Sequence, residues 1–201
     1  MSRKAAHETD RKAELLLAAR NLIFVEGTAK LTMRRVGEAV SITEPAVYRH
    51  FRNKEELLRA LIEFMFEGWQ EKLDGLREAS MPASKKLLRL GTLHLTHLFE
   101  HQFNPVLLLS EANMSEQPAI KATLNAKGEL MFEAMAAMVR EGCESGEFPA
   151  DLNVKSACLA LLGTLQGSLI RWTLTRSTRG LAADVEGALR LIIRGLAAQG
   201  G

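Results

Sequence analysis

The chain of 201 residues has 47% hydrophobic and 25% charged residues and a formal net charge of +2, as expected for an ordinary globular protein with a buried core. Only 5% of its residues are aromatic, and this composition favours an all-helical fold. Its two cysteines, Cys143 and Cys158, are too few for a disulfide framework. No run of 18 apolar residues and no apolar signal core is present, so we expect a cytoplasmic protein without a membrane partner. We also expect no cofactor.

The basic residues are concentrated at the N-terminal end. Residues 1–52 contain ten Lys/Arg and six Asp/Glu, whereas residues 53–201 contain 16 and 18. This asymmetry fits a nucleic-acid-binding head on a more acidic body. A solvated basic tail would give the same balance, so charge alone does not separate the two.

The first elements in chain order are a longer helix and two short helices with recognisable ends. Apolar spacing predicts a helix over about 10–25 that ends at Gly27. Thr32 can cap a second helix through about Val40, and Thr43 can cap a third over 44–50. Pro45 is tolerated in the first turn of that third helix, because the amide there has no helical partner.

A long connector helix is expected next, from Asn53 to about Leu76. The sequence "NKEE" offers a side-chain cap at Asn53 and acidic residues at the positive helix end. Its broad apolar stripe is wide enough to pack on both the head and the body. Further helices are expected over about Ala83–Glu100, Val106–Ala112, Gln117–Glu144, Val154–Thr175 and Leu181–Ala198.

The third helix has two distinct sides. Val47 and Phe51 point inward, while Pro45, Tyr48 and Arg49 fall on the outer side. Two short helices with a tight turn and a supporting helix form a helix-turn-helix, whose second helix enters the major groove of DNA. A solvated helix face remains the alternative by pattern alone.

The stretch "LTMRRVGEAVSITEPAVYRHFRNKEELLRAL", Leu31–Leu61, closely resembles the DNA-binding head of the tetracycline-repressor (TetR) family of bacterial transcription regulators. The matching positions are Gly27, Thr32, Ala39, Thr43, Tyr48, His50, Phe51 and Lys54–Leu57. Two positions depart from the usual pattern: Ser41 replaces a turn glycine and Gly37 replaces an alanine. Ser41 must then tolerate a left-handed conformation, and Gly37 weakens its helix by up to about 1 kcal/mol.

The resemblance implies a role for each residue of the head. The residues that would face base edges are Thr43, Glu44, Pro45, Ala46 and Arg49. Those that would lie at phosphates are Thr32, Arg34, Tyr48, His50 and Lys54. Glu44 is expected to cap its helix or face solvent, with acceptance from a cytosine amino group as the alternative. The basic residues Arg3, Lys4, Arg11 and Lys12 are expected in a disordered, solvated terminus, although they could reach phosphates or a minor groove.

The resemblance also implies a ligand-responsive, DNA-binding transcription regulator, a repressor that binds a palindromic operator as a homodimer. We expect a helix-turn-helix head over 1–53, with the connector and a ligand-binding and dimerisation body over 54–201. The apolar stripes of the last two helices would form the dimer interface through Leu161, Leu165, Leu169, Trp172, Val185, Leu189, Ile192 and Leu196. The same stripes could instead face only their own core, or do some of each.

A ligand chamber would lie among the middle helices and the connector and would accept a small apolar or amphipathic ligand. Its candidate lining is Phe64, Met65, Trp69, Leu90, His94, His97, Leu98, Phe103, Met131, Met135 and Met138. Met131, Met135 and Met138 share one helical face, which suits an adaptable pocket but equally a packed core.

His94, His97 and His101 recur at the spacing i, i+3 and i+7. Metal ligands could have this spacing, but one straight helix seldom supplies three ligands to one ion. We therefore expect no metal site and interpret these histidines as polar pocket residues or buried core residues.

No catalytic constellation is recognisable. The sequence contains no nucleophile–base pairing, no glycine-rich phosphate loop and no paired carboxylates in a plausible arrangement, so an enzyme is not expected. The alternative function is a helical DNA-binding structural or adaptor factor without small-molecule control.

Overall fold

The computed structural model describes residues 3–105, 108–109, 117–175 and 179–197, and the regular secondary structure of this part of the chain is entirely helical. The chain packs as two compact units, an N-terminal unit (Met1–Glu67 with Leu108–Leu124) and a second unit (Gly68–Leu107 with Asn125–Gly201). Over the described residues, no helix combines the length and apolar character needed to cross a membrane. The all-helical fold class predicted from the sequence is confirmed.

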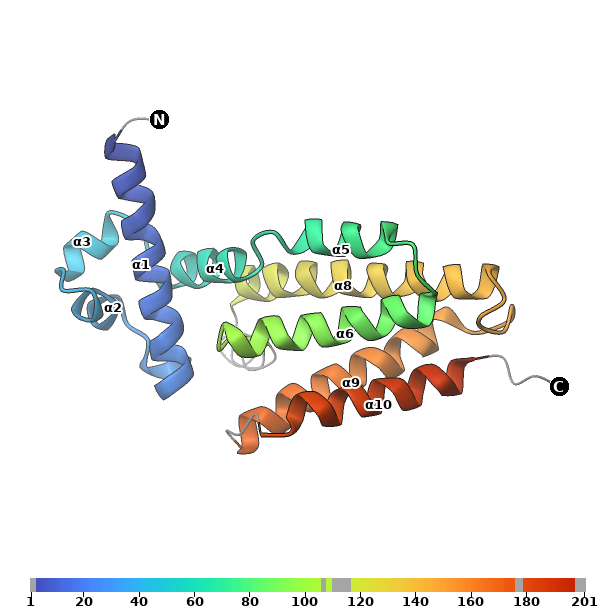
Figure 1. Ribbon diagram of the computed structural model, residues 1–201. Coiled ribbons are helices and arrows are strands. Elements are labelled where there is room, and N and C mark those ends of the chain that lie inside the picture. Colours follow the sequence, from blue (N-terminus) through green and yellow to red (C-terminus); the bar gives the residue numbers. More distant parts are fainter. Residues whose placement is uncertain (1–2, 106–107, 110–116, 176–178, 198–201) are drawn as a thin grey trace. The chain divides into compact units, whose positions relative to one another are not determined.

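The N-terminal unit is built on a supporting helix and a pair of short helices. Its elements are α1 (Arg3–Glu26), η1 (Thr28–Lys30), α2 (Met33–Ala39), α3 (Glu44–Tyr48) and α4 (Lys54–Met65). Within this unit α1 lies between the α2–α3 pair and α4 (Figure 1). Leu15 and Ala19 of α1 and Leu57 and Leu61 of α4 are fully buried, so the apolar stripes of these helices form the core.

Helix α1 begins earlier than the sequence predicted, at Arg3 and not at about Asp10. Arg11 pairs with Glu14 at 2.7 Å, and Lys12 Nζ lies 5.4 Å from the centroid of the Phe51 ring. The segment from Arg3 is therefore helical and not the disordered terminus that the sequence predicted. It contains no glycine or proline and is rich in Ala, Lys, Arg and Glu, which all favour a helix.

Gly37 lies where α2 meets α3. A Cβ at this position would be 2.8 Å from the carbonyl oxygen of Ile42 and 3.0 Å from Cγ2 of Val47. The Ile42 N–H donates to the Gly37 carbonyl at 2.9 Å, and Ser41 adopts the left-handed conformation that the sequence predicted, with φ 59°. Gly37 therefore allows the close approach of the two helices, a role that its low helix propensity does not reveal.

We expect Gly37→Ala to lower the free energy of unfolding by about 1–3 kcal/mol, because overpacking at the helix contact exceeds the gain in helix propensity. Gly75→Ala is the matched control, since a Cβ at Gly75 meets no atom within 4 Å. That variant should be stabilised by about 0.5–1 kcal/mol. Urea denaturation of both variants measures the difference, and equal shifts would contradict the assigned role of Gly37.

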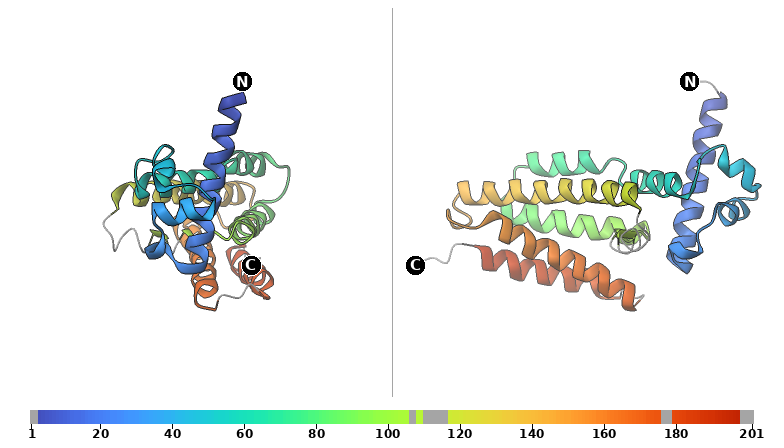
Figure 2. Two further views of the ribbon diagram at one scale, coloured as in Figure 1. Left: turned by 90° about the vertical axis from the view of Figure 1, so that its left-hand side faces the viewer. Right: turned by 180° about the vertical axis from the view of Figure 1, so that it is seen from behind.

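The second unit consists of helices in layers. Its elements are α5 (Trp69–Glu78), α6 (Ala83–Glu100), α8 (Pro118–Glu144, from Asn125 onward in this unit), α9 (Val154–Thr175) and α10 (Leu181–Leu196). Helices α5 and α8 lie on one side of α6, and the α9–α10 pair lies on the other (Figures 1 and 2). The bounds predicted for α6 and α9 are confirmed, and the prediction for α8 differs by one residue. The short helix expected over about Val106–Ala112 falls mostly outside the described residues.

The connector is two helices and not the single helix over Asn53 to Leu76 that the sequence predicted. Helix α4 ends at Met65, and α5 begins at Trp69 after Gly68, which has φ 69°. A left-handed glycine ends a helix easily because it has no Cβ to clash. The apolar periodicity continues across the break, which is why the stripe alone did not reveal it.

Lys86 is a buried cation that joins three helices of the second unit. Its Nζ donates to the Arg77 carbonyl at 2.6 Å and to the two carboxylate oxygens of Glu141 at 2.8 and 2.9 Å. Because the lysine side chain is 5% exposed, loss of either partner would leave a poorly solvated charge. The pair therefore fixes α6 against α5 and α8.

Candidate functional site

The exposed face of α3 is fixed by two buried side chains. Val47 and Phe51 are 0% and 1% exposed, and they hold this five-residue helix against the rest of the N-terminal unit. Thr43 occupies the N-cap position, and its carbonyl accepts from the Ala46 N–H at 2.9 Å. The Thr43 hydroxyl makes no capping bond, in contrast to our expectation, and is exposed.

The residues expected at base edges project from this helix and its start. Thr43, Pro45 and Arg49 are exposed, whereas Glu44 and Ala46 are half-buried. Arg49 follows the last residue of α3, so its guanidinium extends from the helix end and can offer two donors to one guanine. Glu44 is the first residue of the helix, where a carboxylate is favourable to the helix dipole.

The residues expected at phosphates surround this face on neighbouring elements. Tyr48 is 46% exposed and His50 is half-buried. Thr32 caps α2, because its hydroxyl accepts from the Arg35 N–H at 3.2 Å, and Arg34 is exposed and pairs with Glu38 at 3.2 Å. Hydroxyl, guanidinium and amide donors of this kind bind phosphate without reading sequence.

Lys54 and Asn53 fix the start of α4. Lys54 Nζ donates to the Thr28 carbonyl at 2.7 Å, so one of its three N–H groups is already used within the unit. The Asn53 side chain accepts from the Glu56 N–H at 2.8 Å, as predicted, while the Glu56 carboxylate accepts from the Arg52 N–H at 2.7 Å. These bonds position the first turn of α4 and leave two Lys54 donors for a phosphate.

Sequence reasoning missed Arg35 as a positioning residue. Its guanidinium donates to the Glu26 carboxylate at 2.9 Å and to the Lys30 carbonyl at 3.2 Å, so it ties the end of α1 to α2. This hydrogen bond lowers the pKa of Glu26 and raises that of Arg35. The partners are nine residues apart in different helices, a separation that gives no periodic signal.

The candidate chamber residues of the second unit are core residues in this structure. Those that are buried are Trp69, Leu90, His94, His97, Leu98, Phe103, Met131, Met135 and Met138. Phe64 and Met65 lie on α4 in the N-terminal unit, where Phe64 is half-buried and Met65 is buried. The structure brings Trp69 together with His94 and His97, with ring centroids 5.4 and 5.2 Å apart.

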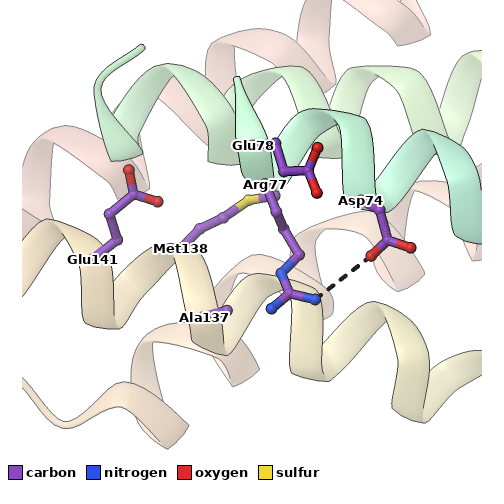
Figure 3. A pocket seen from close by; sticks show the side chains of 6 residues that line it. All are labelled: Asp74, Arg77, Glu78, Ala137, Met138 and Glu141. Atoms are coloured by element: carbon purple, nitrogen blue, oxygen red, sulfur yellow. Dashed lines mark ion pairs between the residues drawn. The ribbon is translucent and has the colours of Figure 1, made fainter. Parts of the chain in front are cut away.

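A surface pocket of about 380 Å³ lies between α5 and α8 in the second unit (Figure 3). It is lined by Asp74, Arg77, Glu78, Ala137, Met138 and Glu141. Of the predicted chamber residues only Met138 contributes to it, and an Arg77–Asp74 ion pair of 3.5 Å crosses its edge. This pocket is charged, so it differs from the apolar chamber that the sequence predicted.

The three histidines of α6 form a row of rings. His97 and His101 lie 4.5 Å apart by ring centroid, and His94 contacts Trp69. Among the described residues, no three His, Cys, Asp or Glu side chains are grouped so that they could hold a metal ion. Burial, assisted by the nearby His97, lowers the pKa of His94 to about 4, so His94 is neutral at physiological pH.

The buried His94 should make stability depend on pH. Its pKa is about 4 in the folded chain and 6.5 in an ordinary environment, so the unfolded chain binds the proton first as pH falls. The contribution of neutral His94 to the free energy of unfolding is therefore essentially complete well above pH 6.5 and falls on acidification, by about 2.5 kcal/mol at pH 4.5. Urea unfolding at pH 7 and 4.5 should show this loss in the wild type, and a smaller loss in His94→Leu. The same loss in both proteins would contradict the assignment.

The stripes expected at a dimer interface mostly face their own core. The buried members are Leu161, Leu165, Leu169, Trp172, Val185 and Leu189, while Ile192 and Leu196 are half-buried. Trp172 packs edge-on against Phe99 with ring centroids 4.9 Å apart, and Gly91 of α6 allows Leu189 to approach closely. These six side chains are therefore buried within the single chain.

The opposite faces of α9 and α10 carry exposed apolar residues that the sequence reasoning did not select. Leu159, Ile170 and Leu174 lie on α9, and Leu191 lies on α10, with Leu174 80% and Leu191 73% exposed. Large aliphatic side chains so exposed on two packed helices are typical of an interaction surface. Leu161, Leu165, Leu169 and Trp172 recur every three to four residues, so apolar periodicity selects this buried stripe and passes over the more widely spaced exposed residues.

Comparisons with known proteins agree with this architecture. Residues 15–61 match the model of "Bacterial regulatory proteins, tetR family". The probable HTH-type transcriptional regulator ArpR of Pseudomonas putida is 27% identical over 198 residues, 92% of this chain and 90% of ArpR. The nucleoid occlusion factor SlmA of Photobacterium profundum is 27% identical over 168 residues, 82% of this chain and 85% of SlmA.

The fold is also that of solved regulators. The structure of FadR from Bacillus subtilis in complex with stearoyl-CoA superposes with a TM-score of 0.76 and 19% identity, and covers 91% of this chain and 98% of FadR. The matched residues 15–61 include the α2–turn–α3 unit with the exposed face of α3. The head over residues 15–61 is therefore a TetR-family DNA-binding head, and the chain as a whole is similar to DNA-binding transcription regulators of that family.

Proposed function

We propose that this regulator is a homodimeric repressor that binds a palindromic operator and releases it when a small apolar or amphipathic ligand binds. Residues 1–53 would form the DNA-binding part, and residues 54–201 the connector with the ligand-binding and dimerisation part. The observation that carries the proposal is the exposed face of Thr43, Pro45, Tyr48 and Arg49 on a helix anchored by buried side chains.

In the proposed complex, α3 lies in the major groove. Arg49 donates two hydrogen bonds to guanine O6 and N7, and Thr43, Glu44, Pro45 and Ala46 face neighbouring base edges. The phosphate contacts come from Thr32, Arg34, Tyr48, His50 and Lys54. Because Arg49 is the residue in this set that can discriminate a base bidentately, it carries most of the sequence preference.

The proposed dimer is formed by the exposed apolar faces of α9 and α10. Leu159, Ile170 and Leu174 share a helical face with the exposed Gly163 and Gly167, which would let a partner helix approach closely. Packing against the same two helices of a second copy gives a four-helix interface with two-fold symmetry. Such symmetry matches a palindromic operator.

The ligand response is proposed as a shift between two conformations. A ligand that binds one conformation of the body better than the other shifts the equilibrium by that difference in affinity. The signal would pass through α4 and α5, the two helices joined at Gly68, and change the separation of the two recognition helices. Support comes from the relative FadR, whose solved structure contains stearoyl-CoA.

A second candidate function is a DNA-binding factor without transcriptional control. The similarity to the nucleoid occlusion factor SlmA over 82% of this chain favours it. Mapping of bound sites across the genome separates the two functions. A repressor should occupy a few sites at promoters, whereas many dispersed sites outside promoters would overturn the proposed repressor.

A further inference from the structure

The second unit contains a buried polar atom without a partner in the protein. His94 is 9% exposed, and its Nδ1 accepts or donates no hydrogen bond. An unsatisfied polar atom of this kind costs roughly 10-fold or more in the folding equilibrium. Buried polar groups are satisfied in most folded proteins, so this nitrogen needs a specific explanation.

Flat rings lie beside this nitrogen. The Trp69 ring is 5.4 Å from the His94 ring and 5.2 Å from the His97 ring, and His101 lies 4.5 Å beyond His97. His101 is half-buried, so the row of rings leads from the buried His94 toward the surface. Aromatic faces of this kind favour a flat apolar partner in an offset or edge-on arrangement.

The surroundings of His94 exclude a charged group as a good partner. Leu90 and Leu98, one turn away on either side along α6, are fully buried. Burial keeps the imidazole neutral at physiological pH, so one ring nitrogen is a donor and the other an acceptor. A carboxylate brought here would lose its hydration without gaining a stable opposite charge. A neutral hydroxyl can satisfy Nδ1 as donor or acceptor.

We propose that His94 is the anchor of the ligand site, and that the ligand is a neutral, flat, mostly apolar molecule whose hydroxyl pairs with Nδ1 while its ring lies against Trp69 and His97. This inference rests on the proposed ligand response and adds the chemical class of the ligand. Side-chain repacking would have to make the space for the ring. The buried Met135 and Met138 lie on α8, which the Lys86–Glu141 pair joins to α6, and methionine changes rotamer at low cost.

The test uses four probes that share one flat ring system: 2-naphthol, 2-methoxynaphthalene, naphthalene and 2-naphthoate. Calorimetry measures their affinities for the full-length chain. We expect 2-naphthol to bind about tenfold more tightly than naphthalene, the value of one well-placed hydrogen bond. The methyl ether can only accept, so its affinity shows whether Nδ1 donates or accepts. We expect 2-naphthoate to bind more weakly than 2-naphthol. Equal affinity for 2-naphthol and naphthalene, or no binding of 2-naphthol, would overturn the proposal.

Two variants at His94 separate the anchor from a structural role. His94→Leu removes the nitrogen and should abolish the preference for 2-naphthol over naphthalene while naphthalene still binds. His94→Asn places an amide close to the position of Nδ1 and should restore part of the preference. Thermal unfolding of each variant confirms that it is folded. A preference that survives in folded His94→Leu would contradict the anchor.

The operator provides the readout that distinguishes this inference from the proposed function. If 2-naphthol binds through His94 but leaves operator affinity unchanged, the ligand-released repressor fails and the anchor stands. If an effector releases the operator and binds equally well to wild type and His94→Leu, the anchor fails and the repressor stands.

Discussion

Replacement of Arg49 by alanine is expected to weaken binding to the selected operator by about 1–3 kcal/mol, roughly 5- to 150-fold, and to relax base preference at one position of each half-site. The physical reason is that a bidentate guanidinium–guanine contact is lost, and no neighbouring side chain on α3 offers the same pair of donors. Arg49 is exposed and follows the last residue of α3, so its removal leaves the core intact. Fluorescence anisotropy with operator DNA and with single-base variants of it measures both effects.

Two variants at proposed phosphate contacts serve as controls for Arg49→Ala. Tyr48→Phe and Arg34→Ala each remove a donor proposed to bind phosphate, so each should weaken operator and random DNA by a similar factor. The Arg34 variant should also reduce the salt dependence of binding by about one unit of slope. If Arg49→Ala likewise weakened operator and random DNA equally, its role in reading a base would be refuted.

The double substitution Leu174→Glu and Leu191→Glu is expected to convert the dimer to a monomer and to weaken operator binding by roughly 100-fold or more. A carboxylate buried without a partner costs about 3 kcal/mol or more, and each substitution would occur twice in a symmetric interface. Both side chains are mostly exposed in the single chain, so the free energy of unfolding of the monomer should change little. Sedimentation velocity and anisotropy measure the two effects.

Leu130→Glu is the matched control for this interface. Leu130 is also an exposed leucine of the second unit, but it lies on α8, outside the proposed contact. It should remain dimeric and bind the operator as the wild type does. A dimer that persists in the double variant, or that dissociates in the Leu130 control, would show that the interface lies elsewhere.

Local signals in the sequence predicted the helix ends well. Thr32 and Asn53 cap their helices through the expected side-chain bonds, and Gly27 takes a positive φ where the first helix was expected to end. These features depend on residues within one turn of each other. Such short-range interactions can be predicted from one sequence without knowledge of the tertiary packing.

Contacts between residues far apart in the sequence were harder to predict. The stripe of Leu161 and Leu165 predicted a buried surface, but periodicity does not say whether the surface is covered by the same chain or by a partner. The break at Gly68 was hidden because apolar residues continue on both sides of it. The burial of Lys86 depends on Glu141, 55 residues away, and neither residue shows this partnership locally.

For the candidate sites too, local features could be predicted from the sequence and long-range ones could not. The exposed set around Arg49 could be predicted because two inward anchors four residues apart, Val47 and Phe51, determine the outer side of a short helix. The anchor proposed at His94 could not, because its significance depends on burial, on the Trp69 ring and on an unsatisfied nitrogen. Sequence spacing placed His94 on a helical edge with His97 but did not indicate its burial or its contact with Trp69.

Selection of bound sequences from a random DNA pool with the full-length chain tests the central claim most directly. A dimeric regulator with α3 in the major groove predicts a palindrome whose half-site centres are about 34–36 Å apart or slightly more. It also predicts a guanine in each half-site that is no longer enriched when Arg49→Ala is used. A single asymmetric site, or no enrichment over the starting pool, would contradict the account.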